Sequence, residues 1–153
     1  MNTIKIGKHI VEIDSNRTRM GYRNIDFESY RCNCDGCRNY YAYADKFEDE
    51  IKSFFKQLGI DDMKNCTEVW MCCKDEEQNI ATYNGWFHVY GQIIEGIDVW
   101  RNDLPWDERI EKITENFSVG FSNSLSLVEK EFEDGCIQIE FFTDIKWVIE
   151  DEV

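Results

Sequence analysis

From residue 67 onward, apolar side chains recur at every second position in several separate runs. In the longest run, residues 80–94, Phe87, Val89 and Ile93 fall on one face. A period of two is that of a β-strand with one buried face, so it argues against a helix here. Strands are therefore expected at 67–73, 80–94, 117–121, 125–132 and 136–149, with one or two more within 4–13. The pair Asp134-Gly135 is expected to turn a hairpin, because these residue types tolerate positive φ.

Residues 39–58 carry a different pattern, with apolar side chains at steps of three and four. The stripe consists of Tyr40, Ala44, Phe47, Ile51, Phe54, Phe55 and Leu58. It predicts one long amphipathic helix over about 39–58, ended by Gly59. A short second helix is expected at about 107–115. The sequence therefore predicts an α+β fold, an antiparallel sheet of five to seven strands with the long helix packed on one face.

Length and composition fit a single domain over residues 1–153. The chain has 153 residues, 42% of them apolar, enough to bury a core without crosslinks. Its first 20 residues contain no continuous apolar stretch, and no window reaches the roughly 18 apolar residues of a membrane span. We therefore expect a cytoplasmic protein with no membrane partner. In that compartment the seven cysteines are expected to be thiols or metal ligands.

Charge is distributed unevenly along the chain. Residues 1–60 contain ten Lys and Arg against nine Asp and Glu, whereas residues 61–153 contain seven against twenty-two. Such an acidic surface repels nucleic acid phosphates, so direct nucleic acid binding is disfavoured. It favours a protein partner with a basic surface, such as a groove that holds DNA or RNA. The other interpretation is that the charge only keeps the protein in solution.

Three cysteines, Cys32, Cys34 and Cys37, lie within six residues. The Cys34-x2-Cys37 spacing lets two thiolates reach one metal ion, and Cys32 is a plausible third ligand. A structural zinc site needs a fourth ligand, for which His88 and the remaining cysteines Cys66, Cys72, Cys73 and Cys136 are the candidates. One bound zinc is therefore a prediction that competes with a metal-free thiol loop.

The same residues also allow a small zinc- or thiol-dependent enzyme. Cys37 is expected near a helix N-terminus with Arg31 and Arg38 beside it, and both effects favour the thiolate. His88 is either a metal ligand or a hydrogen-bonded structural residue. The sequence has no phosphate loop, no G-x-G-x-x-G and no H-E-x-x-H, so no catalytic residue is assigned and an enzyme is the less favoured class.

Tryptophans among acidic residues are typical of interfaces, where a buried aromatic anchor supplies much of the binding energy. The predicted partner-binding residues are Trp86, Trp100, Trp106, Asp98, Asp103, Asp107 and Glu108. The alternative is that the tryptophans fold back over the sheet. A separate arginine cluster, Arg17, Arg19 and Arg23, either pairs with the acidic remainder or binds a signalling nucleotide, which would make the protein a nucleotide sponge.

The order of these motifs resembles that of a group of small acidic proteins. The run Cys-Asn-Cys-Asp-Gly-Cys-Arg-Asn-Tyr leads the helix, Gly-Trp-Phe-His-Val-Tyr-Gly follows at 85–91, and a terminal apolar strand runs into acidic residues. The group is encoded by Gram-positive bacteria and their prophages. Residues 98–116 are an extra segment relative to its pattern. The resemblance implies the cytosol of a bacterial host and no particular activity.

Together these features favour a non-enzymatic binding protein that inhibits or neutralises a protein partner by masking its surface. A phage-encoded inhibitor of a bacterial defence system, of the anti-CRISPR kind or another, is the first context expected, and a toxin-immunity protein the second. The sequence does not fix the oligomeric state.

Overall fold

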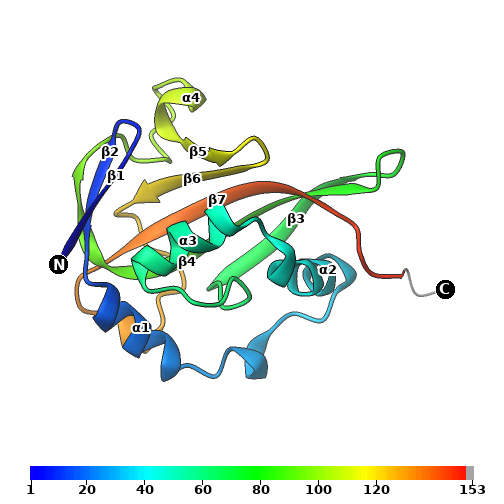
Figure 1. Ribbon diagram of the computed structural model, residues 1–153, viewed down its shortest axis with the longest axis horizontal. Coiled ribbons are helices and arrows are strands. Elements are labelled where there is room, and N and C mark those ends of the chain that lie inside the picture. Colours follow the sequence, from blue (N-terminus) through cyan, green and yellow to red (C-terminus); the bar gives the residue numbers. More distant parts are fainter. Residues whose placement is uncertain (151–153) are drawn as a thin grey trace.

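The computed structural model describes residues 1–150, which form an α+β fold around an antiparallel sheet (Figure 1). This confirms the predicted class and the upper end of the predicted strand number, since the sheet has seven strands. The strands are β1 (Asn2–Ile6), β2 (His9–Ile13), β3 (Glu68–Asp75), β4 (Ile80–Glu95), β5 (Glu111–Thr114), β6 (Phe117–Ser122) and β7 (Cys136–Lys146).

Strand β4 is the centre of the sheet. The strand order is β1-β2-β4-β7-β6-β5, and β3 also pairs with β4. β4 meets β3 along its first half, where Glu68 is opposite Trp86, and β2 along its last residues, where Val11 is opposite Ile93. β7 pairs with the other edge of β4 from residue 80 to residue 90. The 16 residues of β4 therefore hold three neighbours in register.

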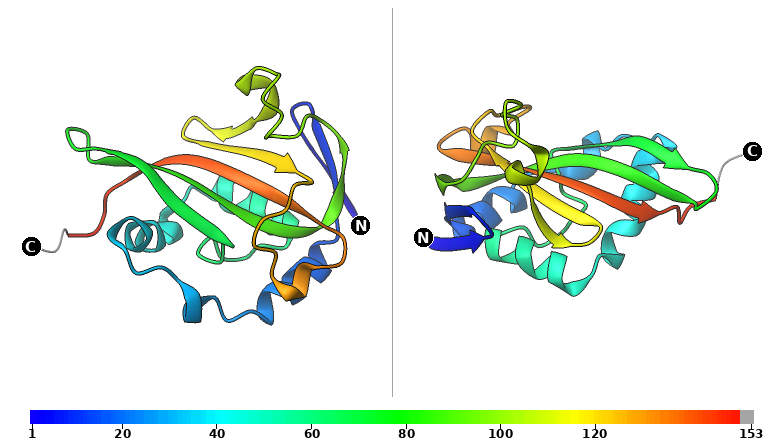
Figure 2. Two further views of the ribbon diagram at one scale, coloured as in Figure 1. Left: turned by 180° about the vertical axis from the view of Figure 1, so that it is seen from behind. Right: turned by 90° about the horizontal axis from the view of Figure 1, so that it is seen from above.

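Three of the helices lie on one face of the sheet (Figure 2). They are α1 (Ser15–Arg23), α2 (Asp35–Tyr43) and α3 (Asp49–Leu58), with a one-turn α4 (Trp106–Arg109) beside β5. Three 3-10 turns connect the elements: η1 (Phe27–Tyr30), η2 (Ala44–Lys46) and η3 (Lys130–Phe132). The core lies between α1–α3 and this face, where Tyr83, Phe87 and Phe141 have 0% exposure.

The prediction of one long helix over about 39–58 is wrong. α2 begins earlier, at Asp35, and the chain then passes through η2 and an extended Phe47 (ψ 146°) before α3 starts at Asp49. Ala44, Phe47 and Ile51 are nevertheless all buried. The apolar spacing survives the break because the 3-10 turn keeps the same side of the chain against the sheet. Gly59 ends α3 in the left-handed conformation (φ 98°), as expected.

The second predicted helix and the hairpin also differ. α4 ends at Arg109, and residues 111–114 form strand β5 instead of continuing a helix to 115. Residues 125–132 form no strand, because β7 takes β4 and β6 as its neighbours on the two sides. Helix α1 was not predicted, since residues 15–23 lack a clear apolar period.

Within residues 1–150, no helix combines the length and the apolar character that crossing a membrane requires. The acidic residues 151 and 152, into which the last strand was expected to run, lie outside the described part of the chain.

Candidate functional site

The second face of the sheet is not covered by α1, α2 or α3 (Figure 2, left); we call it the open face. Residues directly opposite one another in an antiparallel sheet share a face. Trp70 is opposite Asn84, which is opposite Phe142, and in the next row Trp86 is opposite Glu140. Trp70 and Trp86 pack edge to face with ring centroids 5.6 Å apart.

Segment 97–106 adds two tryptophans to the open face. The rings of Trp100 and Trp106 lie 6.3 and 4.8 Å from that of Phe142, both edge to face. The exposed fractions are 42% for Trp70, 43% for Trp100 and 39% for Trp106. Large aromatic side chains usually lose more of their surface than this on folding. The open face therefore presents an aromatic surface that the chain itself only half covers.

Beneath these rings lies a buried carboxyl group, that of Glu140. Its Oε1 accepts hydrogen bonds from the indole of Trp100 (3.1 Å) and from Nε2 of Gln138 (2.8 Å). Its Oε2 accepts one from Nδ2 of Asn84 (3.1 Å). Burial raises the pKa of Glu140, and these three donors act in the opposite direction. Glu140 thus fixes the ring of Trp100 over the centre of the open face.

The acidic residues predicted to bind a partner fall into two groups. Asp98 is turned inward, where it accepts hydrogen bonds from the hydroxyl of Ser122 (2.9 Å) and the backbone N–H of Trp100 (2.9 Å). Asp103 and Asp107 are exposed close in sequence to Trp100 and Trp106, and Glu108 is half-buried. Asp103 pairs with Arg101 at 3.0 Å, which lowers its pKa. Asp98 shapes the segment, whereas Asp103 and Asp107 face solvent.

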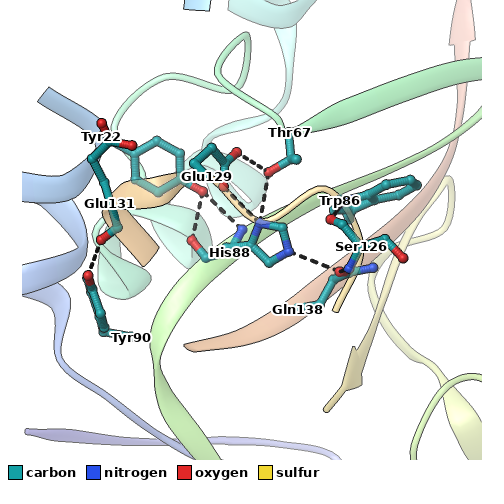
Figure 3. Close-up of polar contacts among 9 residues, drawn as sticks. All are labelled: Tyr22, Thr67, Trp86, His88, Tyr90, Ser126, Glu129, Glu131 and Gln138. Carbon is teal, nitrogen blue, oxygen red and sulfur yellow. Dashed lines mark hydrogen bonds and ion pairs between the residues drawn. The ribbon is translucent and has the colours of Figure 1, made fainter. Parts of the chain in front are cut away.

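His88 is fully buried and hydrogen-bonded at both ring nitrogens (Figure 3). Nδ1 lies 2.9 Å from Glu129 and 3.1 Å from the hydroxyl of Thr67. Nε2 lies 3.0 Å from Oε1 of Gln138, which also accepts a hydrogen bond from the backbone N–H of Ser126. Both ring nitrogens are thus occupied by hydrogen-bond partners. His88 therefore has a structural role here and has no nitrogen left for a metal.

Glu129 is the charged partner of His88. Its Oε1 accepts a hydrogen bond of 2.5 Å from Thr67. Burial acts to raise the pKa of Glu129, but the hydrogen bonds from His88 and Thr67 outweigh it and leave the pKa lowered. The network ties segment 126–129 to the sheet, since the indole of Trp86 also donates to the carbonyl of Ser126 at 3.1 Å.

The three predicted metal ligands do converge. The sulfurs of Cys32, Cys34 and Cys37 all lie within 4.8 Å of one another, at the start of α2. Thiolates at about 2.3 Å from a zinc ion lie roughly 3.8 Å apart, so a small contraction would seat an ion. Among residues 1–150, no further Cys, His, Asp or Glu joins this cluster. The cluster is close enough to hold a metal ion through three ligands.

The thiolate-forming cysteine is a different one from that predicted. Cys34 occupies the N-cap of α2, and the backbone N–H of Cys37 donates to its sulfur, which lowers the pKa of Cys34. Cys37 is buried, and burial with the neighbouring Cys34 and Cys32 raises its pKa. The helix N-terminus thus favours the thiolate at the cap position, not one turn further on.

Two of the three arginines suggested for nucleotide binding, Arg17 and Arg19, make side-chain contacts within the protein. The guanidinium of Arg17 lies 3.8 Å from the ring centroid of Tyr90, and Arg19 pairs with Asp61 at 2.8 Å. Arg23 lines a small cavity of about 150 Å³ with Arg19.

Trp70, Phe142 and Glu140 were not among the predicted site residues. A signal existed for two of them, because the alternation of Ile137, Ile139 and Phe141 places Glu140 and Phe142 together on the other face. A carboxylate and an aromatic ring that share the face opposite the apolar residues of a strand mark a face that does more than pack.

In comparisons with known proteins, no protein-family model, no curated protein and no solved structure matches this chain.

Proposed function

We propose that this chain is a non-enzymatic binding protein whose open face docks and neutralises a protein partner with a basic surface. The observation that supports this is the set of partly exposed rings of Trp70, Trp100 and Trp106 on the sheet face that α1, α2 and α3 leave uncovered. Aromatic side chains that are already fixed in place lose little entropy on binding, which makes them effective anchors.

The negative charge of this chain indicates that the partner has a basic surface. The chain carries a net charge of −14, and Asp103 and Asp107 are exposed beside the tryptophans, with Glu108 half-buried next to them. Interfaces with aromatic centres and charged rims use the rim to steer association and the centre to hold the complex. A basic groove that holds DNA or RNA would satisfy both requirements, and occupying it would inhibit its owner.

The test begins with affinity purification of the tagged protein from its native cells and identification of bound proteins by mass spectrometry. Binding of each purified candidate is then measured by biolayer interferometry. The double variant Trp70→Ala with Trp106→Ala is expected to weaken the affinity by at least about tenfold, mainly through faster dissociation. Met20→Ala is the matched control, because Met20 is exposed and apolar but lies on α1, on the other side of the sheet.

Charge-reversal variants distinguish residues that speed association with the partner from residues that hold the complex together. Asp107→Lys and Glu50→Lys each reverse an exposed carboxylate in the first turn of a helix, α4 and α3 respectively. Asp107→Lys should slow association, and more so at low salt, while Glu50→Lys should not. A partner that binds the tryptophan double variant as tightly as the wild type would rule out docking on the open face.

The thiol cluster supports a second proposal, one zinc ion bound by Cys32, Cys34 and Cys37. Three converging sulfurs form the soft donor set that zinc accepts. Bound there, zinc would hold the loop before α2 in place. Three protein ligands leave one coordination position for water or for a side chain of a partner, and a water in that position would reopen the enzyme interpretation.

Metal analysis of the purified protein tests the zinc proposal. Cells grown with added zinc should yield about one zinc per chain in the wild type and in Cys72→Ser, and almost none in Cys34→Ser. Cys72 is the matched control because it is an exposed thiol outside the cluster. Equal zinc in the two variants would refute this site.

A further inference from the structure

A cavity of about 610 Å³ opens between η1, the start of β3 and segment 127–131; we call it the η1 cavity. Buried Phe27 and Cys66 line it, as do Leu127 and Tyr30, which are 67% and 54% exposed. The volume lies within the range of sites that bind small molecules or single side chains. Leu127 adopts a left-handed backbone (φ 54°), a strained conformation for a side chain of its size.

The lining of the η1 cavity is predominantly acidic. Carboxylates from Asp26, Glu68, Glu129 and Glu131 face two cations, Arg31 and Lys130. Glu129 is engaged by His88 and Thr67. The remaining three carboxylates form no ion pair with any residue of the described chain. The cavity therefore has carboxylates to spare for a positively charged guest.

The pKa of Tyr30 is shifted in the direction that this negative charge favours. Burial and the negative charges of Glu129, Glu131 and Asp26 raise the pKa of the Tyr30 phenol to about 12. A negative potential that disfavours a phenolate favours a cation at the same place.

Aromatic rings complete the chemistry. Phe27 and Tyr30 are tilted against each other with ring centroids 5.9 Å apart, and Tyr41 lines the cavity under the guanidinium of Arg31, 5.1 Å from its ring centroid. A cation on an apolar stem gains both from carboxylates and from aromatic faces. A phosphate or carboxylate ligand would meet the surplus of negative charge and is disfavoured.

The η1 cavity adjoins the open face. Glu68 lines the cavity and is opposite Trp86 in the sheet, while Ser126, next to Leu127, accepts the hydrogen bond of the Trp86 indole. A partner chain lying on the open face would therefore reach the cavity within one or two residues.

We propose that the η1 cavity is a receptor for an arginine side chain of the basic partner. Its acidic lining would pair with the guanidinium, and its aromatic rings would contact the aliphatic stem. The source of the cation rests on the function proposed above, whereas the selectivity of the cavity for a guanidinium does not.

The test titrates the protein with N-acetyl-arginine amide and follows the backbone amide signals by NMR. Shifts are expected at Thr67, Glu68 and Leu127, with an affinity on the order of millimolar for so small a probe. N-acetyl-citrulline amide has nearly the same shape without the charge and should bind at least about tenfold more weakly, because hydrogen bonds to charged groups are stronger. Equal binding of the two probes, or no shift at these amides, would overturn the proposal.

Variants locate the site. Glu68→Gln with Glu131→Gln should weaken binding of the arginine probe by about tenfold or more, while Glu50→Gln on α3 should leave it unchanged. Thermal unfolding checks that all three proteins are folded. Agmatine distinguishes the sources, because a free amine that binds far more tightly than the arginine probe would overturn the assignment to a partner side chain.

The two proposals fail separately. If the arginine probe binds but the partner binds the tryptophan variants as tightly as the wild type, the cation site is supported and docking on the open face is refuted. If the tryptophan variants lose the partner but the arginine probe does not bind, docking on the open face is supported and the cation site is refuted.

Discussion

The two faces of the sheet are built from the same strands and differ in what their side chains do. On the helix-covered face, Tyr83, Phe87 and Phe141 are buried in a continuous aromatic core. On the open face, several of the buried side chains are polar, among them Asn84, His88 and Glu140. Burying polar groups gains little net stability even when all are hydrogen-bonded. The covered face therefore supplies the folding free energy, and the open face holds segments 97–106 and 123–131 in position.

The largest expected effect is on the covered face. Phe141→Ala should lower the free energy of unfolding by about 3–5 kcal/mol, because it removes a ring packed against Phe87, Phe117 and Tyr40. Urea denaturation followed by far-UV circular dichroism measures this. A loss as small as that of an exposed tryptophan would contradict the assignment of the core to this face.

The next effect is at the centre of the open face. Glu140→Ala leaves the donors of Gln138 and Trp100 without their acceptor, so a loss of about 1–3 kcal/mol is expected. Because burial raises the pKa of Glu140, its contribution to stability is complete below the unfolded value of about 4 and falls as pH rises through the folded pKa. The difference between wild type and variant should therefore shrink from about pH 4 towards pH 7.

Glu129 should show the opposite dependence on pH. Glu129→Gln weakens the hydrogen bonds to His88 and Thr67 and is expected to cost about 1–2 kcal/mol near pH 7. Since the pKa of Glu129 is lowered in the folded protein, its stabilisation is present above the unfolded value of about 4 and is lost as pH falls through the folded pKa. The free energy of unfolding of both glutamate variants should be measured across one pH series. If the two losses of stability change with pH in the same direction, the opposite pKa shifts of Glu140 and Glu129 are wrong.

The smallest effect on stability and the largest on binding should come from one residue. Trp106→Ala removes an edge contact with Phe142 from a side chain that is already 39% exposed, so a loss of about 1 kcal/mol or less is expected. Binding of the identified partner should nevertheless weaken by about tenfold. Stability and affinity measured on the same protein preparation test this; a large stability loss would make Trp106 a core residue.

The strands could be predicted because successive side chains of a strand point to opposite faces, so apolar residues recur at every second position. Val89 and Phe87 point to one face and His88 and Trp86 to the other, whatever the neighbouring strands are. Helix continuity could not be predicted the same way. Ala44 and Phe47 keep the helical spacing of apolar residues although the backbone between α2 and α3 is not an α-helix. The spacing of apolar residues therefore indicates which side of the chain is buried, but not whether the backbone between them is a continuous helix.

The site was predictable only in part. Trp100 and Trp106 were identified from their residue type and their acidic surroundings, and Trp86 from its residue type alone. The inward turn of Asp98 depends on Ser122, a residue from another strand, so no local pattern reveals it. The η1 cavity likewise arises from three segments far apart in the sequence, which is why its acidic residues looked like ordinary surface charge.

The dependence of β4 on distant neighbours bears on how quickly this protein reaches its final shape. Val11 finds Ile93, and Gly85 finds Phe141, only across long intervening stretches of chain. Closing such loops is entropically expensive before any pairing rewards it. During synthesis the central strand must wait for its C-terminal neighbour to emerge, so maturation on a timescale of roughly milliseconds to seconds after release is expected. Until then the unpaired backbone edge of β4 is open to pairing with other chains in the cell.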